Sequence, residues 1–212
     1  MSNCLVVGIA GGSASGKTTL TAALADALRE IPGCRPAIIA ADQYMHRDRE
    51  RGPSFLFQAT GEVMFNANHP DAVEWERLLR DLDDRLQQED GPNVILLEGL
   101  MVLHIPEVRE RLDLRIFVEL DADERALRRL LRDMQRTRGI SEPAGIAAYY
   151  LESARVGHAR YVEPSRVHAD LIVRGDADWE RLRPLLVAVI EAKLPGRRGS
   201  AGEPEAGEPE RL

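Results

Sequence analysis

Cysteine, aromatic residues and long apolar runs are all scarce in this chain of 212 residues. Cysteine occurs only at positions 4 and 34, which excludes a framework of disulfide bonds as the source of stability. No apolar run approaches the roughly 20 residues that a transmembrane helix needs. The first expected strand begins almost at the first residue, so we expect no signal peptide. These absences predict a cytoplasmic protein without a membrane partner.

An excess of positive charge is also missing, since the formal net charge is −7. Binding to the phosphate backbone of a nucleic acid requires a basic surface, so a nucleic-acid polymer is not expected as a partner. A small molecule held in one local basic pocket remains compatible with this charge. The length suits one large α/β domain, and a homo-oligomer stays open.

One motif stands out against this background. Residues 11–18 read GGSASGKT and fit G-x-x-x-x-G-K-[ST], the pattern of a phosphate-binding loop. The glycines let backbone N–H groups surround a polyphosphate, Lys17 supplies a positive charge, and the hydroxyl of Thr18 suits Mg²⁺. An apolar strand at 5–10 precedes the loop and a helical pattern at 19–28 follows it, which is the order that the motif requires.

Strands and helices alternate along the rest of the chain. Further strands are expected at 36–40, 93–98, 114–120 and 170–173, and helices at 71–88, 121–136, 142–163 (one long or two short) and 178–193. This alternation predicts a three-layer α/β fold of the P-loop NTPase type, with a five-stranded parallel sheet flanked by helices. Residues 43–70 show no clean period and are interpreted as a loop with some helix over the sheet edge.

The last residues differ in composition from the rest. Residues 195–212 are dominated by Gly, Pro and Glu and cannot bury apolar surface. We therefore predict a P-loop domain at 1–194 and a disordered tail at 195–212.

Two acidic residues follow expected strands. Ligands of open parallel sheets bind at the carboxyl ends of the strands, so Asp42 and Glu98 should lie on the same edge as the phosphate-binding loop. Asp42 could take a proton from a hydroxyl or hold Mg²⁺ through water, and it could also be a helix or turn cap. Glu98 could lie near Mg²⁺, or it could bond loop amides structurally.

A dense run of arginines lies on the helix expected at 121–136 and just beyond it. The spacing of Arg125, Arg128, Arg129 and Arg132 places them on one side of the helix. Such cations can stabilise a transferring phosphoryl group, although a solvated charged face is the usual explanation of such a run.

In combination, these motifs resemble the uridine kinase family of P-loop small-molecule kinases over roughly residues 4–176. The matching segments are GIAGGSASGKTT at 8–19, DQY at 42–44, HPDA at 69–72, EG at 98–99, the arginine pattern from Asp123 to Asp133, EPS at 163–165 and ADLI at 169–172.

The resemblance implies ATP and Mg²⁺ as cofactors and an ATP-dependent kinase that phosphorylates a hydroxyl of a small molecule, with a nucleoside favoured. It implies Asp42, Lys17 and Arg132 as catalytic residues, Thr18, Asp42 and Glu98 near the metal, and a lid at about 128–142. The residues implied to bind ATP are Gly11, Gly12, Ser13, Ala14, Ser15, Gly16, Lys17, Thr18, Thr19, Arg128 and Arg132. Those implied on the acceptor side are Asp42, Tyr44, Asn68, His69, Arg129 and Tyr149.

The acceptor side departs from the family pattern. Asn68 stands where uridine kinases have an aspartate that holds ribose hydroxyls, and Tyr149 stands where the family often has a base-reading glutamine. Only residues 83–92 separate the helix from the next strand, so the base-reading hairpin of uridine kinases is expected to be absent there. Another riboside, a vitamin precursor such as pantothenate, or a sugar phosphate are alternative acceptors. Arg47, Arg49 and Arg51 would suit an anionic acceptor or simply be solvated.

Two other classes of function stay open. A nucleotide switch of the GTPase type would need D-x-x-G and N-K-x-D motifs, and neither occurs in the sequence. A nucleotide-binding regulatory protein with an inert kinase fold is the other alternative, and the intact Lys17, Thr18, Asp42 and Glu98 argue against it.

Overall fold

A computed structural model describes residues 4–48, 50–135 and 142–194 of the chain. A central sheet of five parallel strands has the order β2-β5-β1-β6-β7. The strands are β1 (Leu5–Gly11), β2 (Pro36–Ala40), β5 (Val94–Glu98), β6 (Leu114–Glu119) and β7 (Leu171–Arg174). The predicted parallel sheet of five strands is therefore confirmed.

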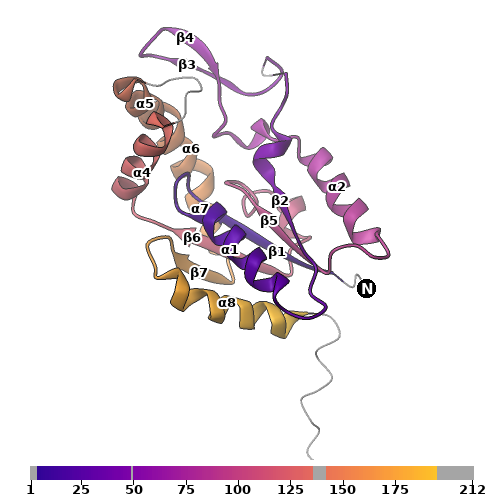
Figure 1. Ribbon diagram of the computed structural model, residues 1–212. Helices are drawn as coiled ribbons and strands as arrows, with labels where there is room; N and C mark the ends of the chain where they lie inside the picture. Colours follow the sequence, from indigo (N-terminus) through magenta and orange to yellow (C-terminus); the bar gives the residue numbers. More distant parts are fainter. Residues whose placement is uncertain (1–3, 49, 136–141, 195–212) are drawn as a thin grey trace, which may run out of the picture.

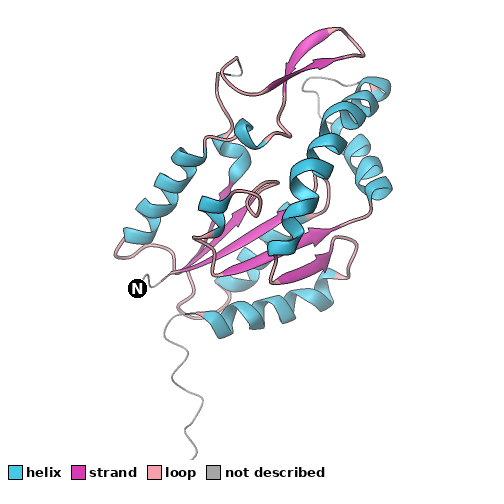
Figure 2. Ribbon diagram, turned by 180° about the vertical axis from the view of Figure 1, so that it is seen from behind, coloured by secondary structure: helices cyan, strands magenta, loops and turns pink. Residues whose placement is uncertain are grey.

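Helices cover both faces of the sheet (Figures 1 and 2). On one face lie α1 (Lys17–Arg29) and α8 (Trp179–Lys193), and on the other lie α2 (Trp75–Gln87) and α3 (Pro106–Arg109). Side chains of β1 alternate between the two cores: Leu5, Val7 and Ile9 pack toward α1 and α8, whereas Val6 and Ala10 pack toward α2. The expected three layers are present.

The carboxyl ends of the strands carry a second group of elements. Helix α4 (Ala122–Met134) follows β6, and α5 (Pro143–Tyr149) lies beside it. The backbone then stays helical through a π turn at Tyr150–Ala154, α6 (Arg155–Gly157), a second π turn at His158–Val162 and α7 (Glu163–Ser165). The residues predicted at 142–163 are thus one helical run with two widened turns.

The interpretation of residues 43–70 as loop with some helix needs a correction. After a 3-10 turn at Ala41–Tyr44, the chain forms an antiparallel hairpin of β3 (Ser54–Phe57) and β4 (Glu62–Phe65), which lies beside α5 (Figure 1). The sequence pattern that predicts a hairpin was present but short. Two aromatic-containing runs of four residues flank a turn in which Gly61 adopts a φ of +74°. Between α2 and β5 no hairpin occurs among the described residues, as expected.

Two predictions concern residues outside the described ranges. The tail predicted at 195–212 lies wholly outside them, and so does the part of the predicted lid at 136–141. The predicted helix at 71–88 is shorter than expected, because the chain from Pro70 first makes a 3-10 turn and an extended step at Val73 before α2 begins.

Candidate active site

The phosphate-binding loop joins β1 to α1, and its backbone departs from ordinary geometry at its end. Gly16 has a φ of +96°, a left-handed conformation that glycine adopts without the penalty of a Cβ atom. The backbone N–H of Ser15 donates to the carbonyl of Gly12 at 3.1 Å, which closes the turn. Helix α1 begins at Lys17, so its positive N-terminal end faces the loop.

Lys17 is buried beneath this loop, and 9% of its surface is exposed. Burial lowers the pKa of Lys17, while the carboxylates of Glu98 and Asp42 oppose that shift. The guanidinium groups of Arg132 and Arg129 also act to lower the pKa of Lys17, so both lie near enough to act on its charge. A buried ammonium needs anions for compensation, which the phosphates of a nucleotide would supply.

Glu98 and Thr18 are in direct contact at the end of β5. The hydroxyl of Thr18 lies 3.2 Å from each carboxylate oxygen of Glu98. Burial raises the pKa of Glu98, the charge of Asp42 adds to the shift, and Lys17 and Thr18 oppose it. A carboxylate that is poorly solvated in this way gains from a nearby cation.

Asp42 lies on the 3-10 turn after β2 and is exposed to solvent. Strands β2 and β5 are paired with Ala40 opposite Glu98, so Asp42 and Glu98 leave the sheet at the same edge. The structure therefore brings Lys17, Thr18, Glu98 and Asp42 together at the carboxyl ends of the strands.

The residues present fit ATP and Mg²⁺. A Cβ atom on Gly12 would lie 2.9 Å from Nη1 of Arg125 and 3.0 Å from Nδ1 of His158, so glycine at this position lets these two side chains pack closely against the phosphate-binding loop. The oxygen donors of Thr18, Glu98 and Asp42 suit Mg²⁺. Among the described residues, no group of three His, Cys, Asp or Glu side chains could hold a metal alone, which is compatible with an ion that also takes phosphate oxygens and water.

Arg129 and Arg132 face a cavity beside this edge, and they share one partner. Nε of Arg132 donates to Asp133 at 2.8 Å, and Nε of Arg129 donates to the other carboxylate oxygen of Asp133 at 3.2 Å. Arg129 also stacks over the ring of Tyr149 at 5.4 Å. The role of Asp133 as their common partner was not predicted from the arginine spacing.

Arg128 points elsewhere, toward the connection between β7 and α8. Its Nη1 donates to the carbonyl of Gly175 at 3.0 Å, and it pairs with Glu124 at 3.6 Å. Arg128 therefore does not join Arg129 and Arg132 at the cavity, although Gly175 itself packs against the phosphate-binding loop.

Three residues predicted on the acceptor side are engaged within the protein. The hydroxyl of Tyr44 donates to Asp81 on α2, and its ring is buried in the core. Asn68 is buried and its amide donates to Ser153 at 2.9 Å. His69 accepts from the backbone N–H of Asp71 at 3.2 Å and packs on Tyr161. Tyr149 differs from these three, because it lines the cavity.

Gly175 provides a first test of the loop's packing. Its N–H donates to the backbone carbonyl of Glu119 at 2.6 Å, and a Cβ atom there would lie 1.9 Å from the backbone carbonyl of Ser15. We expect Gly175→Ala to displace the phosphate-binding loop, weakening ATP binding by about tenfold or more and lowering stability by about 1–3 kcal/mol. Calorimetric titration with ATP and thermal unfolding measure the two effects.

Gly33→Ala is the matched control for that variant. Gly33 has a φ of +78°, and apart from its two chain neighbours no residue has an atom within 4 Å of the place that a Cβ atom would take, so alanine there adds backbone strain without touching the site. This control should lose about 1 kcal/mol of stability and keep its ATP affinity. Equal ATP affinity in Gly175→Ala and Gly33→Ala would contradict the assigned packing.

His158 gives the fold a dependence on pH. Burial and the nearby Arg125 lower the pKa of His158 to about 4, and its Nε2 lies 3.2 Å from the carboxylate of Glu163. Its Nδ1 has no hydrogen-bond partner within the described part of the chain, which fits a neutral ring that donates through Nε2.

We expect this histidine to cost stability at acid pH. In the unfolded chain a histidine titrates near pH 6.5, so between 6.5 and 4 the unfolded state binds a proton that the folded state does not. The contribution of the neutral His158 to the free energy of unfolding is fully present above pH 6.5. It falls by up to about 3 kcal/mol at pH 4. Urea unfolding at several pH values measures how the free energy of unfolding depends on pH. This dependence should be weaker in His158→Gln than in the wild type or in His46→Gln. If the free energy of unfolding of His158→Gln changed with pH as steeply as that of the wild type, His158 would not be neutral in the folded protein.

The parallel sheet, the phosphate-binding loop and the carboxylates at its edge define the P-loop class of nucleotide-binding proteins with a kinase-like site. Comparison with known proteins then gives the family. The sequence profile of the "Phosphoribulokinase / Uridine kinase family" matches residues 81–178. The chain is 34% identical to uridine kinase of Chlamydia pneumoniae over 81% of this chain and 82% of that protein. It is 33% identical to uridine kinase of Chloroflexus aggregans over 91% and 97% of the two chains.

The protein belongs to the phosphoribulokinase and uridine kinase family. The fold agrees, since the solved structure of a proposed fructose transport system kinase from Silicibacter sp. TM1040 superposes with a TM-score of 0.61, at 22% identity, over 80% of this chain and 89% of that one. Within the described residues, no helix has the length and apolar character to cross a membrane.

Proposed function

We propose that this protein is an ATP- and Mg²⁺-dependent kinase that transfers the γ-phosphoryl group to a hydroxyl of a small molecule, most naturally a nucleoside. The observation that carries the proposal is the meeting of Lys17, Thr18 and Glu98 with the exposed Asp42 at one edge of the sheet. The uridine kinases among the relatives support a nucleoside acceptor. A cytoplasmic location and a possible homo-oligomeric state belong to the same proposal.

Each side chain has a part in the proposed reaction. Bound Mg·ATP supplies the phosphoryl group and a metal ion that neutralises charge on it. Thr18 and Glu98 would hold the metal, with Asp42 near it. Asp42, exposed at the sheet edge, would take the proton from the acceptor hydroxyl as its oxygen bonds to the γ-phosphorus, while the bond from that phosphorus to ADP breaks and ADP leaves. Lys17 and Arg132 stabilise the negative charge of the transferring group.

A panel assay tests the proposal directly. The protein is incubated with Mg·ATP and, in turn, nucleosides, other ribosides, pantothenate and sugar phosphates, while ADP release is followed. We expect ADP release that depends on the acceptor and disappears in Asp42→Asn. A slow ADP release that no acceptor accelerates would instead favour a simple NTPase or a regulatory protein.

A further inference from the structure

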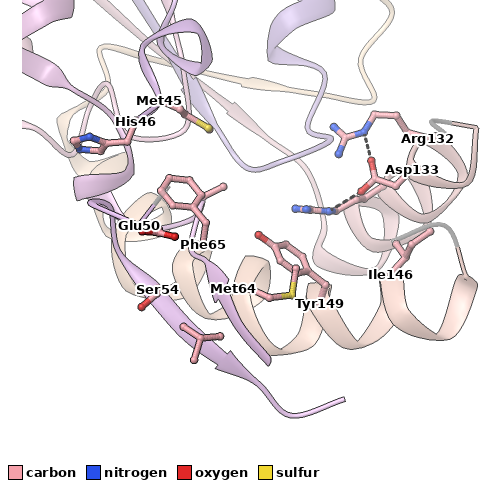
Figure 3. A pocket seen from close by; sticks show the side chains of 13 residues that line it. Met45, His46, Glu50, Ser54, Met64, Phe65, Arg132, Asp133, Ile146 and Tyr149 are labelled. Atoms are coloured by element: carbon pink, nitrogen blue, oxygen red, sulfur yellow. Dashed lines mark hydrogen bonds and ion pairs between the residues drawn. The ribbon is translucent and has the colours of Figure 1, made fainter. Parts of the chain in front are cut away.

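A cavity of about 920 Å³ opens beside the proposed catalytic residues. It lies between the β3–β4 hairpin, the turn after Asp42 and the helices α4 and α5. Figure 3 shows Met64 and Phe65 of the hairpin and Tyr149 of α5 along one side, with Arg132 and Asp133 of α4 across from them. We call it the acceptor cavity, because Arg132 lines it together with Met45 and His46, which follow Asp42 closely in the chain.

The hairpin side of the acceptor cavity is held firmly in place. Phe57 is 1% exposed and packs edge-on against Tyr149 with ring centroids 6.2 Å apart. Phe55 meets the same ring at 5.7 Å, and the backbone N–H of Gln58 donates to Glu152 at 2.8 Å. Because these contacts lie entirely within the protein, the apolar wall needs no acceptor to hold its shape.

The charges around the acceptor cavity are already balanced. Asp133 accepts from both lining arginines, Arg129 and Arg132, and Glu50 adds a further negative charge to the lining. In the neighbouring loop, the exposed Arg51 pairs with Asp48 at 3.2 Å and is not part of the lining. An acceptor that carries its own phosphate would need a further cation, because Asp133 and Glu50 match the two lining arginines in charge and Arg132 is already assigned to the transferring phosphoryl group.

The remaining polar groups of the lining are poorly placed to read a substrate strictly. Ser54 and Glu50 are exposed, and Nδ1 of His46 lies 4.0 Å from Glu74. Strict reading by hydrogen bonds, which can reject a wrong substrate by about 10⁴-fold or more, requires buried groups that would be left unpaired. An exposed polar group that a wrong substrate leaves unpaired can form a hydrogen bond with water instead, so it rejects that substrate only weakly. Apolar contacts discriminate by only about 10- to 200-fold per methylene-sized difference.

We propose that the β3–β4 hairpin is the acceptor-recognition element, and that it selects an uncharged acceptor whose flat or apolar group lies against Met64 and Phe65 next to Tyr149. Selection is by shape and not by reading hydrogen-bonding edges, so several ring systems are accepted. This inference rests on the proposed kinase activity and specifies its substrate class. The hairpin lies at a different place in the chain from the base-reading hairpin expected of uridine kinases.

A matched series of acceptors tests the substrate class. Purine and pyrimidine nucleosides, free ribose and ribulose 5-phosphate are compared by kcat/KM at saturating Mg·ATP. We expect all nucleosides to fall within about 100-fold of one another, and ribose and the sugar phosphate to be weaker by more than about tenfold. One base preferred by about 10⁴-fold, or a preference for the sugar phosphate, would overturn the inference and leave the kinase activity standing. ADP release that no acceptor stimulates would overturn both.

Variants of the hairpin test the element itself. Met64→Ala should raise the acceptor KM by about tenfold while the KM for ATP stays within about twofold, and Met64→Leu should restore most of the loss. Leu56→Ala is the control, because Leu56 is 51% exposed on the same hairpin and does not line the acceptor cavity. Thermal unfolding of each variant checks that it is folded. An acceptor KM that is unchanged in folded Met64→Ala, or equally raised in Leu56→Ala, would contradict the assignment.

Discussion

Lys17→Ala is expected to reduce turnover by about 10³-fold or more, which corresponds to about 4 kcal/mol of lost stabilisation of the transition state. The buried ammonium of Lys17 faces Glu98 and Asp42 at the point where the phosphates of ATP would lie. Alanine removes that charge, and water in its place would leave the phosphates unneutralised. The initial rate of ADP release with the best acceptor measures the effect.

The fold should survive this substitution. Removing Lys17 relieves the cost of burying its ammonium, whereas the buried Glu98 loses the cation beside it. Because these two effects oppose each other, the melting temperature is expected to stay within a few degrees. Lys193→Ala is the control, because Lys193 lies at the end of α8, away from the site. Its ammonium donates to the backbone carbonyl of Asp113. Turnover within a fewfold of the wild type in Lys17→Ala would remove Lys17 from the proposed machinery.

Asp42→Asn is expected to lower turnover by about 10²- to 10⁴-fold while the affinity for ATP changes by less than about threefold. Asparagine keeps the shape of the side chain but cannot accept the proton of the acceptor hydroxyl. Asp42 is exposed on its turn, so the change should not disturb packing. Turnover assays and calorimetric titration with ATP separate the two effects.

The nearby Asp48→Asn serves as control for Asp42→Asn. Asp48 is an exposed carboxylate further along the same segment, where it pairs with Arg51. It should behave as the wild type in both assays. Full activity in Asp42→Asn would refute its assignment as the base, and a parallel loss of ATP affinity would move Asp42 from the acceptor side to the metal.

The half of the site that would hold ATP, the phosphoryl donor, could be predicted because its sequence signals are local. The residues of the phosphate-binding loop form one unbroken segment. Asp42 follows one apolar strand closely and Glu98 ends another, which places both at one edge of a parallel sheet. A pattern of this kind needs no knowledge of distant contacts.

The acceptor half could not be predicted because its contacts are long-range. The amide of Asn68 meets Ser153, and the hydroxyl of Tyr44 meets Asp81, and neither partner is marked by any spacing in the sequence. The strands of the hairpin are only four residues long and lie among turn-forming residues, so their pattern was too short to separate from a loop. Motif spacing likewise could not show that Arg128 turns toward Gly175 while Arg129 faces the cavity.

The burial of Lys17 has a practical consequence for chemical labelling. Lysine occurs in this sequence only at positions 17 and 193. An amine whose pKa is lowered is nucleophilic nearer neutral pH, so a nucleotide-shaped acylating reagent would modify Lys17 in preference to Lys193. Peptide mass spectrometry could then report nucleotide occupancy from a single site, with Lys193 as an internal reference in the same molecule.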